Sequence, residues 1–256
     1  MIVENKVAII TGASSGFGKA LAERLVGKGA KVILADIDIK DGERLATELN
    51  YNKDVKVAYF LKCDVTNYAE QKALFDAAEK HFGRVDIVIN NAGIAERQPL
   101  WEDQAGFWKK IIDIDLSAVV EGTRLGLQYA QKHGQGGVII NTASLAGLYP
   151  QALTPAYSAA KFGVVGLTRS LKEYGNQVGV RVNAVAPSFA DTKIIAPIRD
   201  AVQKIAPLVS VDMVIDAFML LIEDDSFSGD VARITPQYGI SVMGRSTGSK
   251  DKKAKL

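Results

Sequence analysis

The sequence has almost none of the residues that build disulfide-bonded or metal-binding proteins. Its 256 residues include one cysteine, Cys63, and two histidines, His81 and His133. A single cysteine excludes an intramolecular disulfide and a zinc site made of several thiolates, and it fits a reducing intracellular compartment. The two histidines lack the spacing of metal ligands, so we predict no metal site.

Excess charge and long apolar runs are missing as well. The net charge is +2, and residues 250–256 contribute +3 of it through four lysines and one aspartate. The rest of the chain carries −1, which excludes nucleic acid and anionic membranes as main partners. No run reaches the roughly 18 apolar residues that span a bilayer. Residues 1–5 lead directly into an apolar run, so we expect no signal peptide.

What the chain does contain is a regular alternation of short β-branched runs and longer amphipathic stretches. The runs typical of strands in a covered parallel sheet are 7–10, 32–35, 55–60, 85–89, 138–141, 180–185 and, last, 231–234. The stretches typical of helices are 18–28, 41–49, 69–82, 104–133, 156–174 and 211–223. The alternation predicts one α/β domain over residues 1–245, a doubly wound parallel sheet flanked by helices. Within it, 188–210 is expected to form a small flap, and 246–256 follows as a disordered basic tail.

A glycine-rich turn lies where the first expected strand meets the first helix. Residues 11–18 read Thr-Gly-Ala-Ser-Ser-Gly-Phe-Gly. Glycines permit a tight turn and close approach of a phosphate, and a helix N-terminus offers free N–H groups to it. We therefore expect a dinucleotide to bind at Gly12, Ser15, Gly16, Phe17 and Gly18, the alternative being a glycine-rich turn without a ligand.

Asp36 ends the second expected strand, 20 residues after Gly16. A carboxylate there can accept hydrogen bonds from both adenosine ribose hydroxyls and would repel a 2′-phosphate. Ile37 follows it, and the next arginine is Arg44. The pattern predicts NAD rather than NADP as the cofactor, with Asp36 and Ile37 beside the ribose.

Two further turns lie at the carboxyl ends of expected strands, where doubly wound sheets bind ligands. We expect Asp64 and Val65 to contact the adenine, and Asn91 and Gly93 to let the backbone pass close to the cofactor. Taken alone, either segment is more typical of an ordinary turn.

Tyr157 and Lys161 are separated by one helical turn and share a helix face. A phenol ordinarily titrates near pH 10, and a neighbouring ammonium favours its phenolate. Ser144 follows a strand and could bind the same substrate oxygen. A lone pair of this kind is more typical of a helix surface, but the glycine turn and Asp36 favour a catalytic site.

The ordered set of these pieces resembles the short-chain dehydrogenase/reductase family over essentially the whole chain. The segments that carry the resemblance are 11–18, 64–65, 90–93, Ser144, Tyr157 with Lys161, and 187–192. It implies a Rossmann-type fold and hydride transfer between a nicotinamide and an alcohol or carbonyl compound. It also implies Tyr157 as general acid/base, Ser144 as the residue that orients the substrate, and Lys161 as a ligand of the nicotinamide ribose. Pro187 and Thr192 would contact the cofactor.

The sequence departs from the pattern of the resembled family at three positions. Asp115 stands where the family has an asparagine that holds a water relay to the lysine, and Ser188 replaces a glycine. An ionised carboxylate accepts hydrogen bonds but cannot donate them, so we expect Asp115 to pair with Lys161 and to alter the pH profile. Residues 122–127, 144–148 and 221–225 resemble one branch of the family, whose substrate-contacting glutamine is replaced here by Thr154. These segments imply kinship more than a shared substrate.

The sequence thus predicts an NAD-dependent oxidoreductase that interconverts a secondary alcohol and a ketone. A hydrophobic substrate is indicated by the apolar residues of the flap: Ile194, Ile195, Ile198, Val202, Ile205, Leu208 and Val209. Those residues could equally pack onto the core or a neighbouring subunit. The alternatives for function are a carbonyl reductase for small or bulky ketones and an inactive NAD-binding protein. The family resemblance further implies a homodimer or homotetramer built through 104–133 and 156–174.

The last three residues, Ala254, Lys255 and Leu256, resemble the Ser-Lys-Leu peroxisomal address. They predict recognition by the peroxisomal import receptor and a peroxisomal location. If the match is fortuitous, we expect the protein in the cytoplasm.

Overall fold

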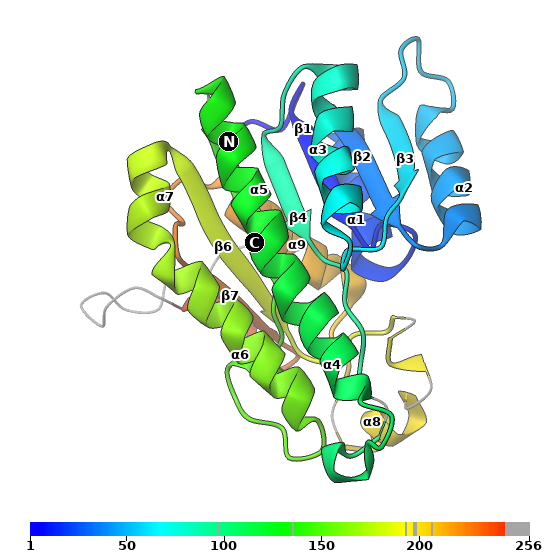
Figure 1. The fold of residues 1–256 in the computed structure, drawn as a ribbon, viewed down its shortest axis with the longest axis vertical. Helices are drawn as coiled ribbons and strands as arrows, with labels where there is room; N and C mark the ends of the chain where they lie inside the picture. The colour runs from blue at the N-terminus through cyan, green and yellow to red at the C-terminus, as the bar shows by residue number, and fades with distance from the viewer. Residues whose placement is uncertain (97, 135, 193, 197–198, 206, 244–256) are drawn as a thin grey trace.

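An eight-stranded sheet forms the centre of the molecule, in the order β3-β2-β1-β4-β5-β6-β7-β8 (Figure 1). The computed structural model describes residues 1–96, 98–134, 136–192, 194–196, 199–205 and 207–243. The strands are β1 (Val7–Thr11), β2 (Lys31–Asp36), β3 (Ala58–Lys62), β4 (Ile87–Asn90), β5 (Gly137–Thr142), β6 (Val180–Pro187), β7 (Val231–Thr235) and β8 (Gly239–Met243). The first seven run parallel, and β8 pairs antiparallel with β7.

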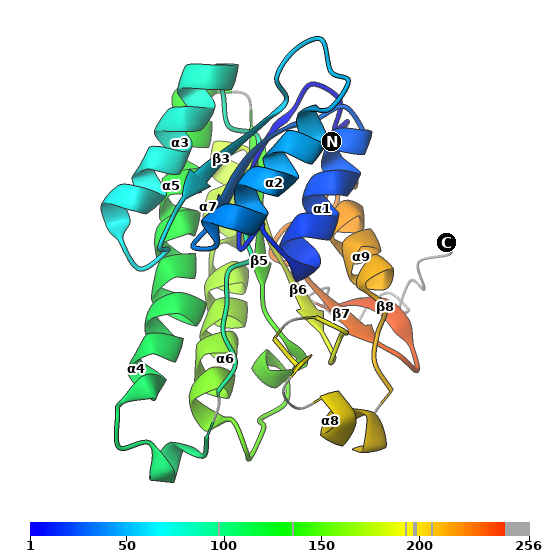
Figure 2. The same cartoon turned by 90° about the vertical axis from the view of Figure 1, so that its right-hand side faces the viewer.

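Helices cover both faces of the sheet (Figure 2). On one face lie α1 (Gly16–Gly27), α2 (Ile39–Asn50) and α9 (Val211–Glu223). On the other lie α3 (Tyr68–Phe82), α4 (Phe107–Ile112), α5 (Ala118–His133), α6 (Pro155–Ser170) and α7 (Lys172–Val178). Because both faces are covered, every residue of β1, β4 and β5 is buried, as the apolar runs predicted. The doubly wound α/β fold is confirmed.

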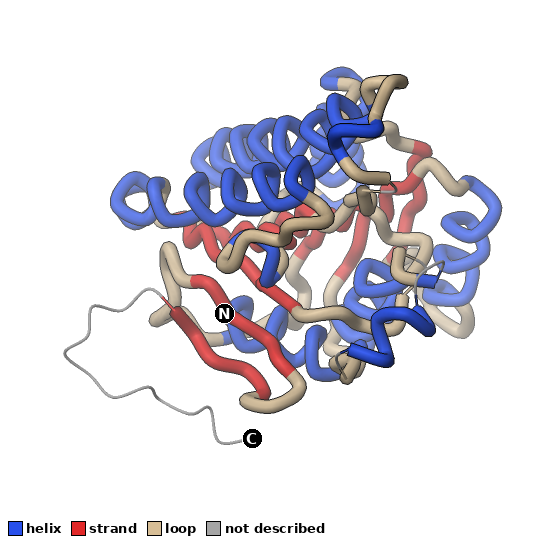
Figure 3. The backbone as a smooth tube through the Cα atoms, turned by 90° about the horizontal axis from the view of Figure 1, so that it is seen from below, coloured by secondary structure: helices blue, strands red, loops and turns tan. Residues whose placement is uncertain are grey.

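The chain winds outward from β1 in two directions, since β1 pairs with β2 on one side and with β4 on the other. This reversal places the ends of β1 and β4 at a topological switch point, where open α/β sheets bind ligands. Figure 3 views the molecule from the end at which the parallel strands terminate, and α8 (Arg199–Ile205) lies at that same end. The residues that follow these strands are therefore gathered on one side of the molecule.

Several element boundaries differ from the sequence prediction. The third strand begins at Ala58 instead of residue 55, because the Asn50 side chain accepts hydrogen bonds from the Val57 and Ala58 N–H groups and holds the preceding residues in a turn. The helix expected over 104–133 begins at Phe107, where Asp103 accepts the N–H groups of Phe107 and Trp108. The stretch 156–174 divides into α6 and α7.

The expected flap is present between β6 and α9. Its base is a bridge between Ala190 and Val209, both packed into the core that contains α1 and α9. Ile195 and Val202 are buried as well, while Ile194 is exposed. The Ile198 residue and the Ile205 side chain lie outside the described residues, as does the tail 246–256. The apolar flap thus packs partly onto the core, which was one of the two expectations.

No helix in the described ranges is long and apolar enough to cross a membrane.

Candidate active site

The glycine turn after β1 is held in a conformation that only glycine adopts easily. Gly12 and Gly16 have φ angles of +64° and +54°. A Cβ atom on Gly18 would lie 2.2 Å from the Gly12 carbonyl oxygen, so the turn and α1 pack too closely for any side chain there. α1 has neither a side-chain cap from Ser15 nor an acidic residue in its first turn. Its N-terminal N–H groups therefore suit an anion such as a pyrophosphate.

Phe17 is half-buried and packs against the core on the α1 face. Phe17 can therefore offer its backbone to a ligand at this turn, while part of its ring is taken up by packing against the core.

Asp36 is oriented by the backbone of its neighbours. Its carboxylate oxygens accept hydrogen bonds from the Ser14 N–H at 2.9 Å and the Asp38 N–H at 3.0 Å. Ile37 is 68% exposed, and Asp36 forms no ion pair with any of the described residues. The carboxylate lies against the glycine turn with no basic side chain to neutralise it, a setting that disfavours a 2′-phosphate.

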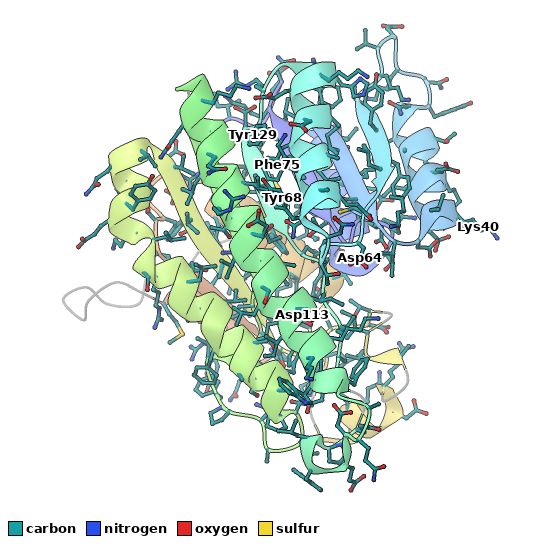
Figure 4. The ribbon with its side chains drawn as sticks, in the orientation of Figure 1. Lys40, Asp64, Tyr68, Phe75, Asp113 and Tyr129 are labelled. Atoms are coloured by element: carbon teal, nitrogen blue, oxygen red, sulfur yellow. The ribbon has the colours of Figure 1, made fainter. Side chains whose placement is uncertain are left out.

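The turn after β3 holds two predicted cofactor-binding residues, Asp64 and Val65, whose side chains lie in different surroundings. Asp64 lies beside the start of α3 (Figure 4), and hydrogen bonds from the Thr66 backbone and hydroxyl hold the pKa of its carboxyl below the usual range. Val65 is buried in the core on the α3 and α5 face. The Val65 side chain therefore packs against the sheet, and contact between Val65 and a cofactor stays a prediction.

Hydrogen bonds join the segment after β4 to the glycine turn. Asn91 Nδ2 donates to the Thr11 and Gly12 carbonyl oxygens at 2.9 and 3.2 Å. The Ala92 N–H donates to Thr11 Oγ1 at 3.1 Å, and a Cβ on Gly12 would come within 2.9 Å of Ala92 Cα. The structure thus brings together the two segments that the sequence assigned to the cofactor.

The flap reaches the same turn. Pro187 ends β6 and is buried, and a Cβ on Gly16 would lie 3.6 Å from Thr192. The Ser188 N–H donates to the Ile234 carbonyl oxygen at 2.9 Å, as an extension of the β6–β7 ladder. Serine in place of the family glycine is therefore accommodated within ordinary strand pairing.

Ser144, Tyr157 and Lys161 form one cluster at the ends of β5 and α6. The Ser144 hydroxyl is close enough to Tyr157 to lower the pKa of the phenol. Lys161 Nζ lies 5.4 Å from the centroid of the Tyr157 ring, as the shared helix face predicted, and donates to the Thr142 carbonyl oxygen at 2.9 Å. A proton-exchanging phenol, a hydroxyl and a cation are thus assembled beside the glycine turn and the β4 segment.

Asp115 forms an ion pair with Lys161, as we expected from its position. It lies in a π-helical turn, Asp113–Ser117, between α4 and α5, and it is fully buried. Its Oδ1 atom is 2.9 Å from Lys161 Nζ, and its Oδ2 atom accepts the Ile94 N–H at 3.1 Å. A Cβ on Gly93 would come within 2.7 Å of Oδ1, so the glycine leaves room for the carboxylate. A π-turn at a functional position is a recurrent feature of enzymes.

These groups influence each other's ionisation strongly. Burial works against the charge of Lys161 more than any other single influence. The charges of Asp115 and Tyr157 and the hydrogen bond to Asp115 together outweigh burial and raise the pKa of the lysine. Burial raises the pKa of Asp115, and Lys161 offsets part of that rise. The pKa of Tyr157 is also raised, chiefly by burial, with Lys161 and Ser144 opposing the rise and Asp115 adding to it. Lys161 therefore favours the phenolate, as its position predicted, but burial keeps the pKa of Tyr157 above its ordinary value.

The arrangement has counterparts among known proteins. Residues 6–203 match the short chain dehydrogenase family. The chain belongs to that family. The 15-hydroxyprostaglandin dehydrogenase (NAD(+)) of Bos taurus is 37% identical over 260 residues, which cover 94% of each chain. The 3beta-hydroxysteroid dehydrogenase 2 of Eggerthella lenta is 37% identical and covers 75% of this chain and 74% of its own.

A solved short chain dehydrogenase, levodione reductase, has the same fold. It is 29% identical, covers 91% of this chain and 96% of its own, and gives a TM-score of 0.83. The branch of the family that residues 122–127, 144–148 and 221–225 resemble is that of the 15-hydroxyprostaglandin dehydrogenases, and that kinship is confirmed.

Two contacts of this dehydrogenase site had no signal in the sequence. The Thr142 carbonyl oxygen binds Lys161, and Glu96 Oε2 accepts the Tyr157 N–H at 3.0 Å. Neither depends on a motif: one uses a backbone atom, and the other joins residues 61 positions apart.

Replacing Asp115 with asparagine is expected to shift the pH profile of alcohol oxidation to lower pH by about one unit or more. The Asp115 charge raises the pKa of Tyr157, so its removal lets the active phenolate form at lower pH. The measurement is the pH dependence of kcat/KM. Asp113→Asn is the matched control, because Asp113 lies in the same turn but is exposed (Figure 4) and should leave the profile in place. An unchanged profile in Asp115→Asn would contradict the coupling.

Proposed function

We propose that this short chain dehydrogenase is an NAD-dependent enzyme that interconverts a secondary alcohol and a ketone on a hydrophobic, lipid-like substrate. The observation that carries the proposal is the cluster of Tyr157, Ser144 and Lys161 beside the glycine turn at the ends of the parallel strands. The glycine turn that would bind the cofactor and the phenol that would exchange the proton therefore lie at the same end of the sheet.

The residues present fit NAD. The turn Gly12–Gly18 leaves no room for side chains at its closest packing and ends in free helical N–H groups for the pyrophosphate. Asp36 would accept hydrogen bonds from the adenosine ribose, Asp64 would meet the adenine, and Lys161 with Tyr157 would hold the nicotinamide ribose. When bound, NAD supplies the acceptor for a hydride from the carbinol carbon.

Tyr157 would take the hydroxyl proton of the alcohol in oxidation and return it to the ketone in reduction. Ser144 lies close enough to influence the Tyr157 hydroxyl and would orient the substrate oxygen between them. The Lys161 cation favours the phenolate through its charge, against the burial and the Asp115 charge that oppose it. Proton transfer by Tyr157 is thus sensitive to the state of the buried pair.

The hydrophobic substrate class is supported by the relatives and by the flap. The relatives named above are dehydrogenases of a hydroxyprostaglandin and of a hydroxysteroid. Near the glycine turn this chain carries the apolar flap residues Ile194 and Ile195, of which Ile194 is exposed. A prostaglandin itself is less well supported, because Thr154 replaces the glutamine that contacts the substrate in that branch.

NADH formation across a panel of secondary alcohols tests this proposal. The panel runs from short alkanols through hydroxy fatty acids and hydroxysteroids to prostaglandins. We expect turnover that depends on chain length, with the best substrates among the larger apolar alcohols. Turnover confined to ketone reduction with small substrates would favour a carbonyl reductase. Retained NAD binding with no turnover of any alcohol or ketone would favour an inactive NAD-binding protein.

We also propose that the protein is a homodimer or homotetramer. Apolar side chains are exposed on the outward faces of α5 and α6, among them Val120 and Phe162. A subunit packed on these helices would remove that surface from water. Sedimentation should give two or four chains per particle, and a monomer at micromolar concentration would contradict the proposal.

A peroxisomal location is proposed for a chain that ends at Leu256. The support is the ending Ala-Lys-Leu behind a run of lysines, which would keep it accessible to the import receptor. Fusing residues 245–256 to the C-terminus of a fluorescent reporter should give punctate fluorescence that coincides with a peroxisomal marker. Diffuse cytosolic fluorescence would overturn the proposal.

A further inference from the structure

The N-terminus of the catalytic helix lacks a cap from its own sequence. Thr154, at the N-cap position of α6, makes no side-chain hydrogen bond to the helix, and the first turn contains no acidic residue. Pro155 occupies the first helical position and has no N–H group. The Tyr157 N–H is therefore among the donors that an α-helix leaves without an internal partner.

Glu96 supplies that partner from a different part of the chain. It lies in the segment after β4, and its Oε2 atom accepts the Tyr157 N–H at 3.0 Å. Two residues earlier, Ile94 packs against the same buried cluster as Tyr157 and donates its N–H to the buried Asp115. The carboxylate is thus tied to the backbone of the catalytic tyrosine itself, and the positive end of the α6 dipole favours its charge.

The second oxygen of the same carboxylate has no hydrogen-bond partner in the part of the chain that the structure describes. Glu96 Oε1 is shielded from solvent, yet no donor among the described residues binds it. A buried acceptor without a hydrogen bond costs free energy, and such groups occur where a ligand completes the bonding. A carboxylate can only accept, so the missing group must be a donor such as a hydroxyl.

We propose that Glu96 determines substrate specificity: Oε2 positions α6, and Oε1 accepts a hydrogen bond from a second hydroxyl group of the substrate. The assignment rests on the proposed alcohol dehydrogenase function, because it places the substrate at Tyr157. It predicts that the enzyme favours alcohols with a further hydroxyl and disfavours those with a carboxylate at the same place, where like charges would meet.

The test compares kcat/KM for three kinds of probe: cyclohexanol, the 1,2-, 1,3- and 1,4-cyclohexanediols, and the corresponding hydroxycyclohexanecarboxylates. Cyclohexanol lacks a second hydroxyl or carboxylate group. Dividing the kcat/KM of each other probe by that of cyclohexanol therefore cancels any effect of a substitution on the position of Tyr157. In Glu96→Gln, the amide oxygen can still cap α6 while the NH2 group replaces the free acceptor with a donor. We expect the ratio of the best diol to cyclohexanol to fall about tenfold or more, and the ratio of the best hydroxycarboxylate to rise.

Glu102→Gln is the matched control, because Glu102 carries the same carboxylate at an exposed position shortly after Glu96. It should change neither ratio. If Glu96→Gln scales all three probes by one factor, the assignment is overturned and Glu96 only positions the helix.

A thermal unfolding curve shows whether Glu96→Gln is folded. If it is not, Glu96→Asp retains the charge but withdraws it by one methylene, and the diol preference should fall in that variant too. A diol preference unchanged in Glu96→Asp would overturn the assignment.

Failure of the proposed function gives a different result. In that case wild type would form no NADH from any of the probes or from the alcohol panel, and both proposals would fall together.

Discussion

Phenylalanine in place of Tyr157 is expected to lower kcat for alcohol oxidation by about 100- to 10,000-fold. The substitution removes the group that exchanges the proton of the substrate oxygen. The ring still packs against Ile111, Ala156 and Ala160, so the fold and the cofactor turn should persist. NADH formation gives the rate, and quenching of protein fluorescence gives the dissociation constant of NADH, which we expect to change less than the rate.

Tyr238→Phe is the matched control for this prediction. Tyr238 is an exposed tyrosine in the β7–β8 turn, remote in the sheet order from the cofactor turn. Removing its hydroxyl should leave kcat within a factor of about two. Equal losses in the two variants would show that Tyr157 acts through stability alone, and full activity in Tyr157→Phe would remove it from the mechanism.

Alanine in place of Asp36 is expected to weaken NAD binding by about 10- to 100-fold. The lost interactions are hydrogen bonds between a charged acceptor and the ribose hydroxyls. With Ile37→Arg added, the preference should turn toward NADP, because an exposed guanidinium beside the ribose would bind the 2′-phosphate. Calorimetric titration with NAD and NADP measures both effects.

Asp38→Asn is the control for cofactor choice. Asp38 lies two residues away, and its carboxylate caps α2 through the Asp41 N–H. An asparagine keeps that acceptor, so the NAD affinity should change only a few-fold. If Asp36→Ala bound NAD and NADP as wild type does, the carboxylate would have no part in cofactor selection.

The parallel strands could be predicted because strands that are buried on both faces are continuous apolar runs in the sequence. β1, β4 and β5 are continuous apolar runs that end in turn residues. β8 could not be predicted in this way, since all five of its residues are only half-buried. Its place in the sheet follows from pairing with β7, which is a tertiary contact.

The same distinction applies to the residues of the site: positions set by spacing along the chain could be predicted, and contacts that need the tertiary structure could not. Tyr157 and Lys161 could be paired from spacing within one helix, and Asp36 from its distance to the glycine turn. Val65 was predicted from its place after a strand, and the burial of its side chain in the core could not be predicted, because turn chemistry and core packing place the same residue type there. Glu96 had no signal in the sequence, because its contact with Tyr157 exists only once the segment after β4 meets the N-terminus of α6.

The π-turn at Asp113–Ser117 restricts how the length of this helix can change. A π-turn holds one residue more than the α-helical turn it replaces, and each α-helical residue advances the chain by about 100°. Deleting any one residue of the turn would allow a regular helix to form but would swing Asp115 away from Lys161 or rotate the buried face of α5. Over evolutionary time this stretch can therefore exchange side chains freely at its exposed positions, while single-residue deletions are eliminated.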